Sequence, residues 1–221
     1  MSAAAPPAGA PRAPRPRVVL ASASPRRRDL LAALGLPFAV RPVDLDETPR
    51  PGEAPRDYVS RLAAEKAAAD ARPGELVLAA DTVVVLDEED GGPQRLLGKP
   101  GGPEEAEEML ARLAGREHVV FTGVALIAAA DGGGGPRRAT AVEESRVRLA
   151  PLGAAEIAWY VATGEPLDKA GAYAIQGIGA LFVEAVEGNY TNVVGLPLPA
   201  VYRLFGELGH DLRTFLTEPQ R

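Results

Sequence analysis

The sequence of 221 residues has no cysteine, only two histidines and few aromatic side chains, which make up 5% of the total. The lack of cysteine excludes disulfides, thiolate zinc sites and cysteine nucleophiles. His118 and His210 lie far apart in sequence, which argues against histidine-rich metal sites and most histidine-based acid–base schemes. A catalytic metal would therefore be a hard ion held by carboxylates.

Long apolar runs are also missing, since none approaches the roughly 18 residues of a membrane span. The formal net charge of -6 argues against non-specific nucleic-acid binding, so an anion site would be a local basic pocket. Residues 1–16, rich in Ala, Pro and Arg, predict a disordered leader, and residues 17–221 are enough for one large domain or two small lobes. We expect a soluble, cytoplasmic protein without membrane or nucleic-acid partners.

The first unusual feature is a basic helix start. A strand predicted at residues 18–20 leads into a helix that Ser24 caps and Pro25 begins. Three consecutive arginines at positions 26–28 follow, where the helix dipole and the free backbone N–H groups favour negative charge. This start predicts a phosphate site, although a solvated basic turn explains it about as well when the feature is taken alone.

The second feature is a carboxylate inside an apolar strand. Residues 76–86 form a continuous apolar run, typical of a central strand buried on both faces, and Asp81 interrupts it. An ionised carboxylate there is costly unless it is paired, hydrogen-bonded or bound to metal. We therefore predict that Asp81 is a site residue, with a structural Asp at a strand kink as the alternative.

Other polar residues could belong to a functional site only if the fold brings them close to Asp81. An acidic loop holds Asp46 and Glu47 and is either a solvated surface loop or part of a divalent cation site. Lys66 lies at the margin of the apolar face of a helix predicted at residues 55–71, where a lysine usually extends to water. Lys99 ends a strand predicted at 96–100, and the sequence leaves open whether it meets Asp81.

The remaining elements alternate between strands and helices, which predicts an α/β fold. Further strands are predicted at residues 38–43, 118–129, 139–149 and 180–186. Further helices are predicted at 103–113, at 156–161 with Trp159 as a packing residue, and at 199–208. Residues 87–95 and 131–136 are predicted hairpin tips, and a stretch of small residues at 165–177 includes Gln176, whose amide can bind a base.

Taken together, a basic helix start, carboxylates and isolated lysines suit the metal-dependent hydrolysis of a phosphoanhydride. Carboxylates can bind a metal and activate water, while cations neutralise the charge that builds on phosphate oxygens. A serine-nucleophile scheme is poorly supported, because Ser22 and Ser24 have no histidine partner close in sequence.

Five segments, in order, resemble the Maf family of nucleoside triphosphate pyrophosphatases: LASASPRR (20–27), ADTVV (80–84), LGKP (97–100), DKAGAYAIQG (168–177) and NVVGLPL (192–198). The resemblance covers nearly the whole chain after Arg17. It implies an elongated α/β fold, shared with the inosine triphosphate pyrophosphatase superfamily, in which a mixed sheet with flanking helices forms two lobes around a cleft. It also implies cleavage between the α- and β-phosphates to a nucleoside monophosphate and pyrophosphate.

By position, the resemblance makes Asp81 the proton acceptor and a metal ligand. Glu47 is then the second metal ligand, with Asp46 beside it as the alternative, and the ion is Mg²⁺ or Mn²⁺. Lys66 and Lys99 match the lysines that face the phosphates.

The same resemblance makes the loop of Ser22, Ser24, Arg26 and Arg27 a triphosphate cradle. It implies that Arg26, Thr82 and Gln176 discriminate the base, whereas Arg28 is interpreted as a surface charge.

The motifs resemble the branch that acts on dTTP and UTP, in a housecleaning role for the nucleotide pool, and similar proteins often form homodimers. The alternatives are the branch that acts on 7-methyl-GTP and a non-catalytic nucleotide sensor linked to cell division. Departures from the family pattern are the leader, the longer loops at 87–95 and 131–136, and the presence of Asp46 beside Glu47.

Overall fold

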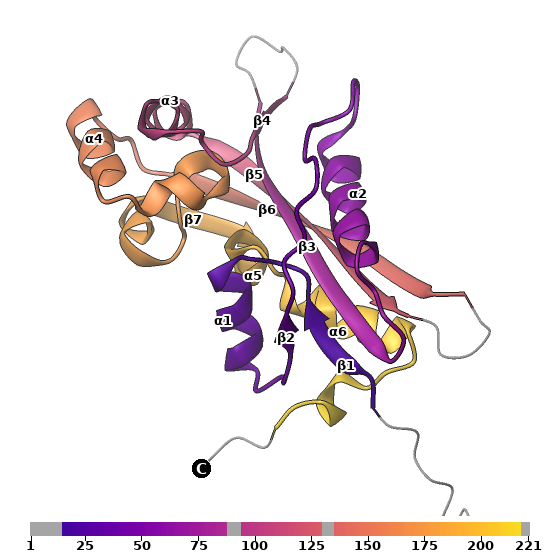
Figure 1. The fold of residues 1–221 in the computed structure, drawn as a ribbon. Helices are drawn as coiled ribbons and strands as arrows, with labels where there is room; N and C mark the ends of the chain where they lie inside the picture. The colour runs from indigo at the N-terminus through magenta and orange to yellow at the C-terminus, as the bar shows by residue number, and fades with distance from the viewer. Residues whose placement is uncertain (1–14, 88–93, 130–134, 218–221) are drawn as a thin grey trace, which may run out of the picture.

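The structure, a computed structural model, describes residues 15–87, 94–129 and 135–217. Within these ranges, seven strands form one mixed sheet in the order β2-β1-β3-β5-β6-β7, with β4 paired to β3 (Figure 1). The strands are β1 (Arg17–Leu20), β2 (Ala39–Val40), β3 (Glu75–Leu86), β4 (Arg95–Leu97), β5 (Glu117–Ala128), β6 (Arg137–Leu149) and β7 (Val183–Gly188). The α-helices are α1 (Pro25–Ala33), α2 (Pro55–Ala68), α3 (Pro103–Leu113), α4 (Ala154–Ala162), α5 (Tyr190–Val194) and α6 (Leu198–Glu207). Short 3-10 helices are η1 (Glu165–Asp168), η2 (Ala170–Ala172), η3 (Gly177–Phe182) and η4 (Leu212–Thr214).

The rest of the sheet is arranged around β3. This strand runs parallel to β1 and antiparallel to β4 and β5. Its apolar run is buried almost throughout, as the sequence at 76–86 predicts. The strands predicted at 118–129 and 139–149 correspond to β5 and β6. The α/β class, with a mixed sheet and flanking helices, is confirmed.

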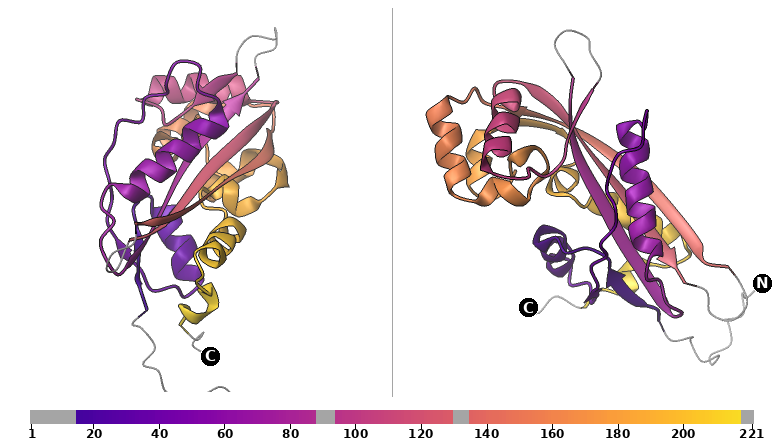
Figure 2. Two further views of the ribbon diagram at one scale, coloured as in Figure 1. Left: turned by 90° about the vertical axis from the view of Figure 1, so that its right-hand side faces the viewer. Right: turned by 45° about the horizontal axis from the view of Figure 1, so that its top comes forward.

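Helices cover the two faces of the sheet differently. On one face α2 packs against β3, with Leu62 beside Val83 and Ala63 beside Val77 in two small clusters. The other face carries two larger clusters. One joins β1 and the first part of β3 to α1 and α6, and the other joins the last part of β3 to α3 and α4. These two sets of helices lie towards opposite ends of the long strands (Figure 1, Figure 2).

A glycine in β5 lets α2 approach the sheet closely. A Cβ at Gly123 would lie 2.2 Å from the Val59 carbonyl oxygen of α2, which no real side chain allows. Gly123 is also the β5 partner of Asp81 in β3. Lys66 follows Val59 by about two helical turns and therefore lies on the same side of α2. The close approach brings Lys66 to Asp81.

Three predicted strands extend further than the strands in the structure, and the one predicted at 96–100 ends at Leu97. Of residues 38–43, only Ala39 and Val40 pair, because the nearby Pro37 and Pro42 cannot donate to a ladder. The prediction of one strand over that whole range is therefore wrong.

The strand predicted at 180–186 begins only at Val183. The Glu165 carboxylate accepts hydrogen bonds from the main-chain N–H groups of Ile178 (2.9 Å) and Gly179 (2.8 Å). These bonds hold the preceding residues in η3 instead of an extended strand.

Other differences are smaller. The helix predicted at 55–71 ends at Ala68, and α5 and η4 were not predicted. Trp159 packs edge-on against Phe182, but at the surface, where it is 53% exposed. Most of the predicted leader and of the two hairpin tips lies outside the described residues. No described helix combines the length and the apolar character needed to cross a bilayer.

Candidate active site

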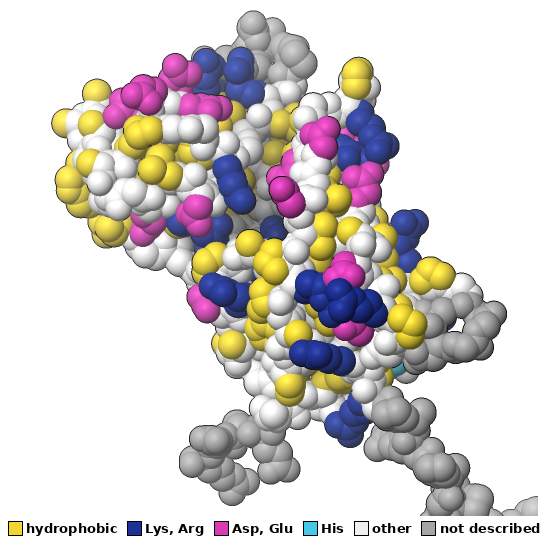
Figure 3. Space-filling model, viewed as in Figure 1, with side chains coloured by type: hydrophobic (Ala, Val, Ile, Leu, Met, Phe, Trp, Pro, Cys, Tyr) yellow, Lys and Arg dark blue, Asp and Glu magenta, His cyan; other side chains and the backbone are white. Residues whose placement is uncertain are grey.

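An open stretch in the middle of β3 forms one wall of a cavity. β1 pairs with β3 as far as Leu78 and β4 pairs from Val84 onward, so residues 79–83 have no neighbour among the described strands on that edge. The cavity at this gap has a volume of about 470 Å³. In the space-filling view, basic and acidic side chains border a hollow between the α3–α4 end and the rest of the molecule (Figure 3). The cavity is lined by every residue that the sequence assigns to the site: Ser22, Ser24, Arg26, Arg27, Glu47, Lys66, Asp81, Thr82, Lys99 and Gln176.

The charged side of the cavity is built around the Lys66 ammonium group. Its Nζ lies 2.6 Å from both Asp81 Oδ1 and Glu47 Oε1. Asp81 and Lys66 are buried, while Glu47 is exposed at the cavity mouth. The alternative in which Lys66 extends to water is therefore wrong, because the close approach of α2 turns the side chain inward.

Glu47, rather than Asp46, faces the cavity. Tyr58 Oη donates to the Glu47 carbonyl oxygen at 2.9 Å and ties the acidic loop to α2. Asp46 Oδ1 instead accepts hydrogen bonds from the hydroxyl and the main-chain N–H of Thr48, which lower the pKa of Asp46. Of the two carboxylates that the sequence left open, Glu47 is the one beside Asp81.

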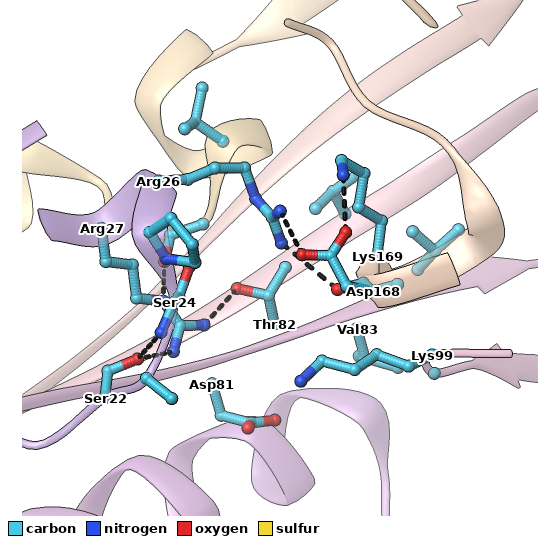
Figure 4. A pocket seen from close by; sticks show the side chains of 18 of the residues that line it. Ser22, Ser24, Arg26, Arg27, Asp81, Thr82, Val83, Lys99, Asp168 and Lys169 are labelled. Carbon is cyan, nitrogen blue, oxygen red and sulfur yellow. Dashed lines mark hydrogen bonds and ion pairs between the residues drawn. The ribbon is translucent and has the colours of Figure 1, made fainter. Parts of the chain in front are cut away.

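Arg27 braces the open edge of β3 with four hydrogen bonds. Its Nε donates to the Gly195 carbonyl oxygen (2.8 Å) and its Nη1 to Ser22 Oγ (3.1 Å). Nη1 also donates to the Ala80 carbonyl oxygen (2.6 Å), and Nη2 donates to Thr82 Oγ1 (3.1 Å). The loss of water around the guanidinium lowers the pKa of Arg27. Arg27 therefore connects the loop after β1, the middle of β3 and the residue that ends α5 (Figure 4).

Two serines shape the loop between β1 and α1. Ser22 Oγ accepts hydrogen bonds from Arg27 Nη1 and from the Ser24 N–H (3.3 Å), which leaves its own proton for a ligand. Ser24 precedes α1 as predicted, but within the described residues its side chain makes no capping hydrogen bond. The first main-chain N–H groups of α1 are thus available to an anion.

Arg26 reaches across the cavity to η1. Its Nη1 lies 3.0 Å from Asp168 Oδ2, and Lys169 Nζ lies 2.6 Å from Asp168 Oδ1 (Figure 4). Partial burial acts to raise the pKa of Asp168, but the hydrogen bonds and charges of Lys169 and Arg26 outweigh it, so the pKa is lowered. Two cations and one carboxylate thus close the cavity on this side.

Lys99 reaches the site through a simple hairpin. The register pairs Val84 with Leu97, so the antiparallel return brings the chain at Lys99 back towards the middle of β3. The side chain extends along the cavity towards Asp81 (Figure 4). The geometry that the sequence left open is therefore explained by antiparallel pairing.

Known proteins resemble this chain over most of its length. The profile of the family described as Maf-like protein matches residues 17–208. The chain belongs to the Maf family. A dTTP/UTP pyrophosphatase of Anaeromyxobacter sp. (strain Fw109-5) is 56% identical over 196 residues, which cover 89% of this chain and 91% of the relative. The dTTP/UTP pyrophosphatase of Myxococcus xanthus (strain DK1622) is 52% identical over 197 residues, covering 88% and 94%. That of Syntrophus aciditrophicus (strain SB) is 49% identical over 195 residues, covering 87% and 90%.

Within this Maf-family site, the sequence analysis missed three residues near Gln176. Gln176 itself is exposed in the segment between η2 and η3. Asp168 accepts hydrogen bonds from Arg26 across the cavity and from Lys169, and Glu165 holds the start of η3. The signal that could have found them is the concentration of charge at 165–169, next to a run of small residues that leaves room for a ligand.

Proposed function

We propose that this protein hydrolyses nucleoside triphosphates, dTTP and UTP among them, between the α- and β-phosphates. The products are a nucleoside monophosphate and pyrophosphate, in a housecleaning role for the nucleotide pool. The observation that carries the proposal is the buried Asp81–Lys66 pair beside Glu47, in one cavity with the basic start of α1. The names of the relatives support dTTP and UTP as substrates.

The same carboxylates support a divalent cation, Mg²⁺ or Mn²⁺. Asp81 Oδ1 and Glu47 Oε1 converge on one ammonium nitrogen, so their spacing suits a shared cation. The described residues contain no group of three or more metal-ligating side chains. Two carboxylates suit an ion that completes its shell with water and substrate phosphates. When bound, the ion would neutralise phosphate charge and lower the pKa of coordinated water.

Asp81 accepts the proton of the attacking water. Lys66 donates to Oδ1 at 2.6 Å, which leaves Oδ2 to act as the base. The water oxygen bonds to the α-phosphorus while the bond from that phosphorus to the bridging oxygen breaks, and pyrophosphate leaves with the electron pair. Lys99 and the Ser22 hydroxyl stabilise the negative charge on the phosphates.

The test is incubation of the purified full chain with dTTP, UTP, CTP, ATP, GTP and 7-methyl-GTP, with Mg²⁺ or Mn²⁺ or with chelator. Chromatography of the products should give monophosphate plus pyrophosphate from dTTP and UTP, and none in the presence of chelator. Release of orthophosphate in place of pyrophosphate would overturn the proposed cleavage site.

The panel also separates the alternatives. Turnover confined to 7-methyl-GTP would identify the other branch of the family, and tight binding without turnover would identify a nucleotide sensor. The ionic environment of Asp81 argues against the sensor, since binding alone does not require a water-activating carboxylate. A homodimer, a cytoplasmic location and the lack of nucleic-acid partners stay predictions from the sequence.

A further inference from the structure

β3 divides the cavity into a charged side around Asp81 and a hydroxyl side around Thr82. Successive side chains of a strand point to opposite faces of the sheet. Asp81 faces α2, where Lys66 binds it, whereas Thr82 faces the other way and meets Thr122 of β5. Tyr173, which lines the cavity, lies on the Thr82 face as well. The metal belongs beside Asp81, while Thr82 lines the same cavity from the opposite face, where its hydroxyl can meet the uncharged base.

The hydrogen-bond partners of Thr82 and Thr122 determine where the hydroxyl proton of Thr82 points. Arg27 Nη2 donates to Thr82 Oγ1 at 3.1 Å and occupies one lone pair. Thr122 Oγ1 lies 3.0 Å from the Asn192 carbonyl oxygen, which can only accept, so Thr122 uses its single proton there. The 3.0 Å bond between the two hydroxyls must then use the Thr82 proton. Thr82 has only a lone pair left and can act towards a ligand only as an acceptor.

The partner of Thr122 is held rigidly in the interior. Thr122 and Asn192 are fully buried. The Asn192 amide Nδ2 donates to the Val120 carbonyl oxygen (3.0 Å) and to Ser145 Oγ (3.0 Å), which fastens α5 to β5 and β6. Since buried polar groups are costly to leave unpaired, this network keeps the proton of Thr122 directed at Asn192.

We propose that Thr122 is a positioning residue that sets base specificity by fixing Thr82 as a hydrogen-bond acceptor. The inference rests on the proposed hydrolysis of triphosphates. Uracil and thymine carry a ring N–H between two carbonyl groups, and this N–H can donate to Thr82. Cytosine has an unprotonated ring nitrogen at that position, so two acceptors would face each other. Thr122 thereby favours UTP and dTTP over CTP without touching the nucleotide.

Thr122→Val tests this role because it keeps the shape of the side chain and removes the hydroxyl. Thr82 is then free to turn its proton towards the ligand, and the kcat/KM ratio for UTP over CTP should fall about tenfold. Thr122→Ser keeps the hydroxyl and should keep the ratio. Thr140→Val is the matched control on β6, where Thr140 is exposed, and it should behave like the unmutated protein.

Two outcomes on these variants contradict the role of Thr122. The first is an unchanged ratio in a folded Thr122→Val protein that still cleaves UTP. The second is an equal fall in Thr122→Ser, which would make packing the cause rather than the hydroxyl. Failure of the unmutated protein to cleave any triphosphate would instead overturn the proposed function, so the two failures are distinguishable.

A measurement on the unmutated protein covers the case in which Thr122→Val does not fold. CTP and 3-methyl-UTP both lack the ring N–H, and each should compete with UTP at least about tenfold more weakly than dTTP does. Competition by CTP as strong as that by dTTP would overturn the acceptor assignment.

Discussion

The two sides of β3 hold their polar groups in different ways. On the Asp81 side, charges compensate charges: one ammonium group lies between two carboxylates. On the Thr82 side, hydroxyl groups and a carbonyl oxygen pair with one another, each donor proton has a defined acceptor, and the Arg27 guanidinium donates to Thr82. Because neighbouring residues of a strand point to opposite faces, Asp81 and Thr82 place a carboxylate and a hydroxyl group on opposite sides of the sheet at consecutive positions.

Ser22 and Thr82 also differ, although both hydroxyl groups accept a hydrogen bond from the same guanidinium. Arg27 donates to both Ser22 Oγ and Thr82 Oγ1. Ser22 accepts a second bond from Ser24 and keeps its proton, whereas Thr82 gives its proton to Thr122. Ser22 is therefore a donor, suited to phosphate oxygens, and Thr82 an acceptor, suited to a base N–H.

The largest effect on activity should follow from a substitution of Asp81 on the charged side. We expect Asp81→Asn to lower kcat for pyrophosphate release by about 10³-fold, because the water loses its proton acceptor. Asn can still accept a hydrogen bond from Lys66, so the variant should remain folded by circular dichroism. Asp57→Asn, an exposed carboxylate of α2, is the control and should keep normal turnover. Near-normal turnover by folded Asp81→Asn would show that Asp81 is not the proton acceptor.

The charged side was also the side that the sequence predicted better. Asp81 stands out because a carboxylate inside an apolar run demands a partner, and the over-charged start of α1 points to an anion. The partner itself, Lys66, could be found only through the family resemblance, because its helical position alone suggested contact with water. The close approach at Gly123 that turns it inward depends on the tertiary fold.

On the hydroxyl side, around Thr82, the sequence offered little signal. Thr122 and His118 lie in a strand where threonine and histidine are unremarkable, and their partners lie 70 and 55 residues away. The long strands were predictable from apolar runs, whereas β2 and η3 depend on local prolines and on a distant carboxylate. Such long-range hydrogen bonds leave no periodic pattern to detect.

The next largest effect should come from replacing Arg27, whose hydrogen bonds connect α1, β3 and the end of α5. Arg27→Met leaves the carbonyl oxygens of Ala80 and Gly195 without their donor, and we expect a loss of about 3 kcal/mol in the free energy of unfolding. Arg28→Met, one exposed residue further along α1, should change it by less than about 0.5 kcal/mol. Urea denaturation of both variants measures the difference, and equal stabilities would show that the four bonds of Arg27 contribute little.

A smaller, pH-dependent effect should come from the protonation of His118 on the hydroxyl side. His118 Nε2 lies 2.8 Å from Tyr173 Oη, and burial lowers the pKa of His118 to about 4. In the unfolded chain the pKa of His118 has its ordinary value of 6.5, so the unfolded chain binds the proton at a higher pH than the folded protein does. The free energy of unfolding therefore has its full value above pH 6.5 and decreases as the pH falls towards 4. Between pH 7 and pH 5, the unmutated protein should lose about 2 kcal/mol more than His118→Gln. Parallel pH profiles in urea denaturation would contradict this.

The smallest effect should follow at the exposed edge of the cavity, where Arg26 meets Asp168 across the opening. Both side chains are partly solvated, so Asp168→Asn should change the free energy of unfolding by less than about 0.5 kcal/mol. Asp168 competes with phosphate for Arg26, however, and its removal should lower KM for UTP by up to about threefold at low salt, with the difference shrinking as salt is added. A rise in KM would contradict this competition. It would mean that Asp168 orients Arg26 for the substrate, so that the ion pair itself takes part in substrate recognition.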